Sequence, residues 1–478
     1  MTVIFKLKTC ARLICVIVAI TSLLTYFRSK NTNTKYVLHV STGNEMISFV
    51  YPEKKNTTYI TNSHINYNYP KLQDFVQMFQ SRYTSKNSIF AVKSNESYNV
   101  FLKRLSLFTK KGQMLVKETE ILKNTTASRF FRGINQQRLY DPNDEELLQD
   151  LLQDMATLPI ASAVESDVKG TQFKVTLTFV DGTRARVKLM RIPKEVESTV
   201  DMHPGQEFER HFAEIAGYHV DKILGFNRVI PTVGRLFNIT TDLKTLLSNE
   251  TLVEHVYRSP AGNLCFAVYC KQLCGRDYPF CGRPDVIEGA VTVELISGEK
   301  YKRYDLKNEY TRIYKKRPWM ADQNTCMDFV TNHTSRHRSR MPLDQLDLSL
   351  YDFLIGNGDR HSYQMFNDLG TESFPFIYDN GRSFRYSYFD EPIGLVPIQQ
   401  CCEIRLSTLA KLVKLYSGPD SLSQLMRSSM ISDPVSPVLL EPQLQALDRR
   451  LGKIIKAVSD CVSSGKPWDD IVIDDGII

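Results

Sequence analysis

The sequence has little net positive charge outside its first thirty residues. The whole chain carries +7, and segment 1–30 holds five Lys or Arg residues and no acid, so +2 remains for the other 448 residues. No block of Lys or Arg elsewhere looks like a surface that follows a phosphate backbone. This absence argues against a nucleic-acid-binding protein. The hydrophobic share of 42% and the charged share of 24% are ordinary for a globular protein.

The N-terminal end lacks an apolar run of full membrane-spanning length. The run at 13–27 has no charged residue but is shorter than the ~20 residues of a typical span. Basic residues flank it on both sides, and Thr25-Tyr26-Phe27 is not a small-residue cleavage site. We therefore expect an uncleaved signal anchor with its basic front in the cytosol, and a cleaved signal peptide is the alternative. Either alternative places the rest of the chain in a secretory lumen.

The sequence has no Cys-x-x-Cys pair, and no histidine lies near the four closely spaced cysteines between 265 and 281, which argues against a zinc site. Eight of the ten cysteines lie outside the N-terminal segment, and in an oxidising lumen they predict four disulfides. Six Asn-x-Ser/Thr sequons follow the apolar run, at Asn56, Asn95, Asn124, Asn238, Asn249 and Asn332. They fit the same compartment.

No internal repeat or long low-complexity tract is present. The composition instead divides the chain into four expected segments. Residues 1–30 form the cytosolic tip and anchor, and the polar segment 31–127 forms a lumenal stem with ordered stretches near 75–79 and 100–107. Residues 128–285 form a small β-rich lobe with insertions, and 286–478 form a larger, mainly helical lobe.

Hydrophobic periodicity predicts the elements of these lobes. A helix is expected over 145–155 with Asn143 as its cap, and a hairpin over 173–190 with its turn at Asp181-Gly182. A second helix is expected over 208–224, ended by Gly225, and a last one over 440–461. Lys188 lies in the second strand of the hairpin, and Glu209 lies early in the second helix.

Two acidic motifs carry the chemistry. Asp359 follows the apolar run Asp-Phe-Leu-Ile-Gly-Asn at 352–357, and Asp379 follows Phe-Pro-Phe-Ile-Tyr at 374–378. Phosphoryl transfer needs one carboxylate to orient the attacking hydroxyl and another to hold a metal on the phosphates. Lys188 could reach the phosphates, and Glu209 could orient it or bind the metal.

The protein-kinase fingerprint is nevertheless incomplete, because no Gly-x-Gly-x-x-Gly loop and no Ala-Pro-Glu motif occur. The residues alone leave a second interpretation open. Asp359 and Asp379 could be ordinary turn residues, and Lys188 and Glu209 could lie on solvated faces.

A family resemblance favours the first interpretation. Over residues 129–472 the chain resembles the atypical secretory-pathway kinases that include the Golgi casein kinase, its pseudokinase activator and the glycosaminoglycan xylosylkinase. The matching stretches are Leu-Tyr-Asp-Pro at 139–142, Asp-Met-Ala-Thr-Leu-Pro-Ile at 154–160, Gly-Thr-Gln at 170–172, Glu-Arg-His at 209–211, Asp-Phe-Leu-Ile-Gly-Asn at 352–357, Asp-Arg-His at 359–361, Gln-Gln-Cys-Cys at 399–402 and Leu-Asp-Arg-Arg-Leu at 447–451.

The resemblance implies an α+β, protein-kinase-like bilobal fold that is stapled by disulfides. It implies that Asp359 is catalytic and that Glu209 and Asp379 bind the metal. The ATP contacts that it implies are Gln172, Lys188, the hinge Ala290, Val291, Thr292 and Val293, Gln364 and Asp379. The implied disulfides are Cys265–Cys281, Cys270–Cys274, Cys326–Cys401 and Cys402–Cys461. The implied cofactors are ATP and Mn²⁺, with Mg²⁺ as the alternative metal.

Two departures from the family pattern concern the nucleotide site. The usual Asp-Arg-His-His-Tyr-Glu is Asp-Arg-His-Ser-Tyr-Gln here, so Gln364 replaces a glutamate of the ATP site. The usual Phe-Lys-Pro is Val-Lys-Leu at 187–189, which keeps Lys188.

The favoured function is transfer of the ATP γ-phosphate to serine in Ser-x-Glu sites of secreted proteins, in the Golgi lumen or outside the cell. The alternatives are a xylosylkinase that phosphorylates the xylose of the proteoglycan linker, or a pseudokinase that activates a related kinase. Ser-Pro-Ala at 259–261, Cys-Gly-Arg-Pro at 281–284 and Asp-Asn-Gly-Arg at 379–382 favour the protein kinase, and Glu209 argues against the pseudokinase, which has Gln there.

The expected partners are secreted substrates with acidic residues near serine and a related kinase or pseudokinase in a dimer. Nucleic acid is not expected, and membrane contact is expected only through the anchor. Arg382 and Arg385 are candidates for reading the acidic residue of the substrate through charge-assisted hydrogen bonds.

Overall fold

A computed structural model describes residues 2–6, 37–41, 46–50, 70–84, 88–109, 112–117, 123–166, 171–199, 207–298, 301–308, 310, 326, 340–370 and 373–474. The chain divides into two units, Met1–Asn66 and Tyr67–Ile478. In the first, β1 (Thr2–Lys6) pairs in parallel with β2 (Val37–Ser41), and β2 pairs antiparallel with β3 (Met46–Val50). The predicted anchor run at 13–27 lies outside the described residues. Within the described part of the chain, no helix has the length and apolarity that crossing a membrane requires.

The small lobe of the second unit is built on a five-stranded antiparallel sheet of order β4-β5-β6-β11-β7. The strands are β4 (Ile160–Glu165), β5 (Val175–Phe179), β6 (Arg184–Leu189), β7 (Thr232–Asn238) and β11 (Val286–Val293). The predicted hairpin is confirmed, because β5 and β6 pair around Asp181-Gly182. Its alternating side chains Val175, Leu177 and Phe179 are fully buried, so this pattern fixed which face of the hairpin enters the core.

Two helices flank this sheet at the positions that periodicity predicted. Helix α5 (Glu145–Thr157) is capped by Asp144, which accepts the Leu147 N–H, and not by Asn143 as predicted. Helix α6 (His211–Leu224) ends at Gly225, which has φ 62°, a left-handed conformation that favours glycine. The helix begins after Arg210, so Glu209 precedes it, whereas the sequence had placed this glutamate inside it.

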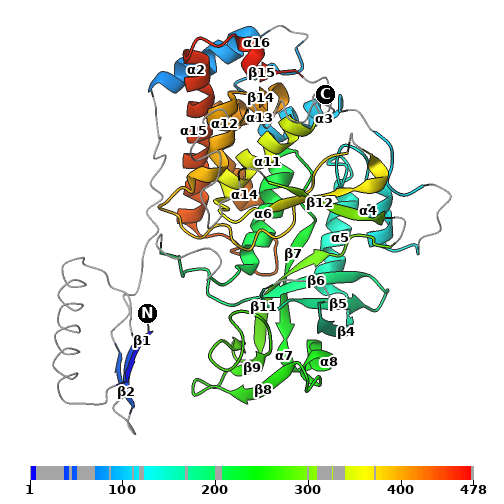
Figure 1. Ribbon diagram of the computed structural model, residues 1–478, viewed down its shortest axis with the longest axis vertical. Helices are drawn as coiled ribbons and strands as arrows, with labels where there is room; N and C mark the ends of the chain where they lie inside the picture. Colours follow the sequence, from blue (N-terminus) through cyan, green and yellow to red (C-terminus); the bar gives the residue numbers. More distant parts are fainter. Residues whose placement is uncertain are drawn as a thin grey trace. The chain divides into compact units, whose positions relative to one another are not determined.

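An insertion at the outer end of the small lobe carries a second sheet of order β10-β9-β8 (Figure 1). It contains β8 (Val253–Arg258), β9 (Leu264–Val268) and β10 (Phe280–Cys281), preceded by the short helices α7 (Ile239–Asp242) and α8 (Lys244–Leu247). Of the described sequons, Asn95, Asn124 and Asn249 are exposed, whereas Asn238 is half-buried and caps α7.

The large lobe is mainly helical. Its helices are α11 (Met341–Ile355), α12 (Val396–Cys401), α13 (Leu406–Ser417), α14 (Leu422–Ser429), α15 (Glu441–Ser463) and α16 (Trp468–Ile471), with the 3-10 turns η3 (Asn367–Leu369) and η4 (Pro392–Leu395). Its strand pairs are β12 (Arg303–Lys307) with β13 (Ser362–Phe366), antiparallel, and β14 (Ile404–Arg405) with β15 (Val472–Ile473), parallel. The predicted last helix is confirmed as α15.

The ordered stretches expected in the stem belong to the same compact unit as the lobes. Helix α2 (Pro70–Arg82) packs on α15, beside which it lies in Figure 1, and α3 (Tyr98–Ser106) packs on α13. Helix α4 (Thr126–Gly133) packs on α5. Phe75, Phe79 and Phe101 are buried in the main core, and this burial explains why short segments of a polar stretch form stable helices.

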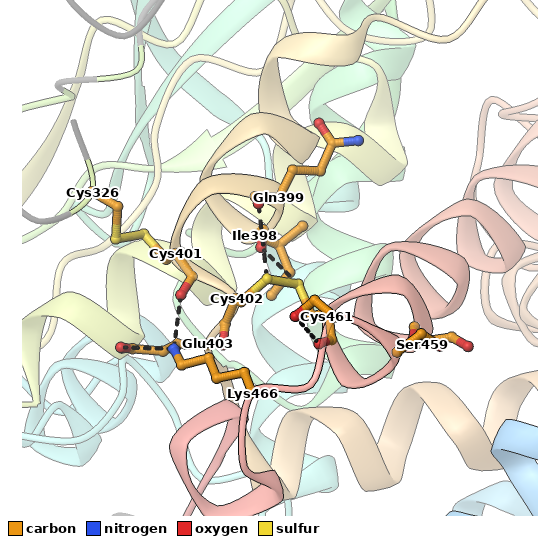
Figure 2. Close-up of a disulfide and its surroundings, with 11 residues drawn as sticks. Cys326, Ile398, Gln399, Cys401, Cys402, Glu403, Ser459, Cys461 and Lys466 are labelled. Atoms are coloured by element: carbon orange, nitrogen blue, oxygen red, sulfur yellow. Dashed lines mark hydrogen bonds and ion pairs between the residues drawn. A yellow bond between two sulfur atoms is a disulfide. The ribbon is translucent and has the colours of Figure 1, made fainter. Parts of the chain in front are cut away.

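All four predicted disulfides are present: Cys265–Cys281, Cys270–Cys274, Cys326–Cys401 and Cys402–Cys461. Figure 2 shows how the adjacent Cys401 and Cys402 anchor the end of α12 to two distant segments. Lys466 donates to the carbonyl oxygens of both cysteines, at 3.2 and 3.3 Å. Two disulfides therefore connect the C-terminal end of α12 to Cys326 and to Cys461 of α15.

The buried His219 on α6 predicts acid sensitivity. Burial lowers the pKa of His219 from 6.5 to about 3, and its Nδ1 lies 2.6 Å from the Ser429 hydroxyl. Between pH 6.5 and about 3 the unfolded chain binds a proton that the folded chain does not, so the free energy of unfolding falls as pH decreases through this window.

We expect His219→Gln to make the free energy of unfolding less pH-dependent in this window, measured by urea denaturation at pH 7, 6, 5 and 4. His255→Gln, at an exposed position, is the matched control. An unchanged pH dependence in His219→Gln would contradict the prediction.

Candidate active site

Three carboxylates contact a single lysine between the lobes. Lys188 on β6 lies with its Nζ 2.7 Å from Glu209 Oε2, 2.5 Å from Glu214 Oε1 and 2.5 Å from Asp379 Oδ1. The structure thus brings together three residues that sequence reasoning selected, across 191 residues of chain. The fourth, Glu214, was missed. It is a buried acid within the nearly fully buried helix α6, and that unusual placement was the available signal.

Glu214 also fixes the loop that carries Asp379. The backbone N–H of Asn380 donates to both Glu214 oxygens, each at 2.9 Å. Asp379 itself has φ 61°, which a non-glycine residue adopts only when surrounding contacts hold it there. Gly381 follows where an added Cβ would stand 2.9 Å from the Cβ of Glu209, so glycine allows this close approach.

Asp379 is held in its ionised form. Burial alone would raise the pKa of this carboxyl, but Lys174 and Lys188 hold it well below its usual range. Lys174, at 3.4 Å from Asp379 Oδ2, is a second residue that sequence reasoning did not select. It lies just before β5, and only the packing of the small lobe onto the loop brings it to the site.

Asp359 lies in the loop after α11 with both carboxylate oxygens near basic side chains. Its Oδ1 is 3.1 Å from His361 Nε2, and its Oδ2 is 3.9 Å from Arg382 Nε. Its backbone N–H donates to the side chain of Asn357, which fixes the loop after α11. The hydrogen bond to Asp359 raises the pKa of His361.

A buried arginine ties the two acidic loops together. Arg360 donates from Nε and Nη2 to Asp352, and from Nη2 to Asn380 Oδ1 at 2.6 Å. It also donates to the carbonyl of Asp379 at 3.1 Å. Because one side chain bonds both loops, the spacing between Asp359 and Asp379 is set by the fold.

The predicted nucleotide residues occupy different parts of the site. Gln172 accepts the Glu209 N–H and donates to the Glu207 carbonyl, so it holds the segment before α6. Gln364 on β13 donates to Asp305 Oδ1 at 3.1 Å, and its backbone pairs with Phe376, three residues before Asp379.

The four residues predicted as the hinge lie inside β11. Ala290 pairs with Lys188 on one side and with Gly234 on the other, and the strand is paired on both sides through Thr292. Because these ladders use the backbone groups, the segment that leaves the sheet begins later, at Glu294. The four residues therefore form the end of β11, where Ala290 pairs with Lys188, and their contact with adenine stays a prediction.

The two arginines proposed to read the substrate are buried. Arg385 is 1% exposed and its Nε contacts Glu207, and Arg382, 6% exposed, donates to the carbonyl of Glu207. Arg385 therefore cannot contact a peptide at the surface, and that assignment is wrong. The two guanidinium groups instead hold the segment that precedes Glu209.

The bonds of Gln172 predict that it positions Glu209. Gln172→Ala should raise the KM for the metal–ATP complex by ~10-fold or more and change kcat less, because losing an outer-shell partner typically costs 10–100-fold in metal affinity. Steady-state kinetics at varied ATP and Mn²⁺ tests this, with the exposed Gln153→Ala as control. An equal loss in kcat with unchanged KM would contradict it.

Glu209 and Asp379 fit a divalent cation. Both carboxylates approach one point, the Lys188 ammonium, within 2.7 Å, so a single cation could be reached by both. Hard oxygen donors of this kind suit Mg²⁺ or Mn²⁺, which complete their shells with phosphate oxygens and water. Among the described residues, no group of three or more His, Cys, Asp or Glu side chains is arranged to hold a metal ion.

The small lobe is a β-sheet whose strand β6 carries a lysine, and a glutamate of helix α6 bonds to that lysine. The two acidic loops belong to a mainly helical lobe. Together these features define a protein-kinase-like bilobal fold. Residues 125–469 match the family model described as Golgi casein kinase, C-terminal, Fam20. The chain belongs to this family.

Relatives in the family have mixed activities. The human extracellular serine/threonine protein kinase FAM20C is 40% identical, the human pseudokinase FAM20A 38% and the human glycosaminoglycan xylosylkinase 32%. Each alignment covers 70% of this chain, and the aligned parts span 57%, 65% and 80% of these relatives. The family therefore includes enzymes and a pseudokinase.

The fold is confirmed by a solved structure of the Golgi casein kinase with Mn/ADP bound. It is 32% identical, with a TM-score of 0.76, and the match covers 88% of this chain and 96% of that one. The hydra Fam20 structure with sugar matches with a TM-score of 0.67 and 30% identity, over 74% of this chain and 99% of that one.

Proposed function

We propose that this chain transfers the γ-phosphate of ATP to serine in Ser-x-Glu sites of secreted proteins, with Mn²⁺ as the metal. The observation that carries the proposal is the convergence of Lys188, Glu209 and Asp379, because a phosphotransferase needs a cation and two metal-binding carboxylates together. The likeness to a kinase solved with Mn/ADP supports the choice of metal and nucleotide.

Each residue has a distinct role in this proposal. Glu209 and Asp379 would hold the metal, which supplies charge neutralisation on the phosphates. Lys188 binds a phosphate oxygen, and Glu214 keeps the lysine in place. Asp359 orients the acceptor hydroxyl and takes its proton, while Arg360 fixes the distance between the two loops.

The presence of Glu209 favours an active kinase over a pseudokinase. Metal binding needs two carboxylates that can reach the same cation, and Glu209 and Asp379 both reach the Lys188 ammonium. We also propose the lumenal location and an association with a related kinase or pseudokinase, for which the family membership is the support.

The acceptor is tested by metal-dependent phosphorylation of three substrates: a Ser-x-Glu peptide, a Ser-x-Ala peptide and a xylose-containing tetrasaccharide primer. We expect Mn²⁺-dependent transfer to the Ser-x-Glu peptide, weaker transfer to Ser-x-Ala and none to the sugar. Transfer to the tetrasaccharide alone would assign the chain to the xylosylkinases. No transfer to any acceptor, with normal folding, would favour the pseudokinase.

A further inference from the structure

A polar pocket lies where α3, the segment around Pro142 and the end of α6 meet the start of α13. Its wall is formed by α3, the loop around Pro142, the end of α6 at Gly225, the residue before α11 and the start of α13. None of Lys188, Glu209, Asp359 or Asp379 lines it. Its charged lining residues are Arg138, Arg228, Arg340, Arg405, Lys411 and Asp347.

These cations share too few carboxylates. Asp344 alone accepts ion pairs from three guanidinium groups, those of Arg228, Arg340 and Arg405, at 2.6 to 2.8 Å. Asp347 contacts Arg405 at 3.1 Å and accepts the Thr408 hydroxyl at 2.6 Å. With Lys411, four cations thus face two carboxylates.

The neighbouring acids do not remove this excess. Arg138 is matched by Asp141, 3.2 Å away. Asp221, which does not line the pocket, accepts the backbone N–H groups of Arg228 and Val229 and the Tyr140 hydroxyl. The five lining cations and the four carboxylates named here, with Asp221 counted as ionised, leave a net charge of +1 at the pocket.

Lys411 carries this excess. It is 8% exposed, and among the described residues no carboxylate lies within 4.0 Å of its Nζ, which donates a hydrogen bond to the Gly225 carbonyl at 3.5 Å. Burial lowers the pKa of Lys411 to about 8, with Arg405 and Arg228 acting in the same direction and the charge of Asp347 acting against it. Within the described part of the chain, the Nε atoms of Arg138 and Arg228, two residues that are each 4% exposed, also have no hydrogen-bond partner. Buried donors and charges of this kind are costly without a partner.

The start of α13 adds donors at the same place. This twelve-residue helix has Arg405 at its N-cap without a side-chain cap bond, and Ser407 and Thr408 of its first turn line the pocket. Free N–H groups and the positive end of the helix dipole favour an anion there. Arginine forks match the geometry of a tetrahedral oxyanion.

We propose that this pocket binds one tetrahedral oxyanion, free inorganic phosphate or sulfate. The anion would meet Lys411, the guanidinium groups of Arg138 and Arg228, and the first turn of α13. A free ion is favoured over a phosphate on a larger molecule because four of the five lining cations are more than nine-tenths buried. The site is independent of the proposed phosphotransfer.

The test is titration calorimetry of the purified full chain without nucleotide or Mn²⁺, with sodium phosphate and sodium sulfate at constant ionic strength set by chloride. We expect saturable binding of about one ion per chain for both oxyanions. Lys411→Met should weaken it at least 10-fold, while Lys456→Met, which removes an exposed lysine paired with Asp460, should leave it within twofold. Arg138→Gln, at the same pocket, is a second variant in case Lys411→Met fails to fold.

No saturable binding to the wild-type chain, or equal binding by Lys411→Met and Arg138→Gln, would overturn the proposal. Equal affinity for O-phosphoserine would overturn the assignment to a free ion and indicate a phosphorylated side chain. Because no nucleotide, metal or acceptor is present, failure here leaves the proposed kinase activity untouched, and an inactive kinase would leave this result unchanged.

Discussion

Asp359→Asn is expected to lower kcat for phosphotransfer by ~10²–10⁴-fold, the usual cost of removing a positioned acid or base. Asp379→Asn should cost at least as much. Asp379 is the carboxylate that both Lys174 and Lys188 hold ionised, and its amide replacement would remove a metal ligand. Both variants keep the shape of the side chain, so both should be secreted normally. The measurement is Mn²⁺-dependent transfer of labelled phosphate to the Ser-x-Glu peptide.

Asp368→Asn is the matched control, since Asp368 is an exposed aspartate in the short η3 turn between the two acidic loops. It should keep wild-type activity. The two active-site variants should also differ from each other. Asp379→Asn should weaken binding of the metal–ATP complex, whereas Asp359→Asn should bind this complex and fail to transfer the phosphate. Normal transfer by either secreted variant would refute the assignment of these two residues.

Removing the Cys402–Cys461 disulfide is expected to destabilise the large lobe by about 4 kcal/mol in the chain-entropy model, because the bond closes a loop of 59 residues. The variant is Cys402→Ala with Cys461→Ala. Cys461 is buried on α15 and Cys402 ends α12, so the bond joins two helices that are distant in the sequence (Figure 2). Chemical denaturation of the purified protein gives the change in the free energy of unfolding.

The chain provides its own control for this loop-length argument. Cys270 and Cys274 are separated by only four residues, so Cys270→Ala with Cys274→Ala should cost about 2 kcal/mol, roughly half as much. Both pairs lie in the same unit and lose the same chemistry. Equal losses from the two variants would contradict the entropic account, and free thiols at Cys402 and Cys461 in the wild-type protein would contradict the pairing.

Local sequence signals predicted the elements that depend on local physics. The alternation of Val175, Leu177 and Phe179, with its Asp-Gly turn, fixed the hairpin that presents Lys188, and Gly225 fixed the end of α6. These signals succeed because side-chain periodicity and turn conformation are properties of neighbouring residues. The positions of Asp359 and Asp379 in their loops also followed from the sequence motifs.

Errors arose where a contact from another segment decided the outcome. Helix α6 starts later than predicted because Gln172 and Arg382 bond the backbone of residues 207–209, which is not helical. Arg385 was predicted as a surface residue in a polar loop. It is buried instead, in an ion pair with Glu207, which lies 178 residues earlier in the chain.

By itself the sequence determined the two-lobe division, the hairpin lysine, the acidic loops and, through resemblance, the cysteine pairing and the kinase fold. Tertiary structure alone decided that Glu214 and Lys174 join the site, that α2 and α3 pack on the large lobe, and that Lys411 is left with a buried charge. The physical reason is that a side chain's electrostatic neighbours are set by distance in space, and the site pairs Lys188–Glu214 and Lys174–Asp379 are separated by 26 and 205 residues.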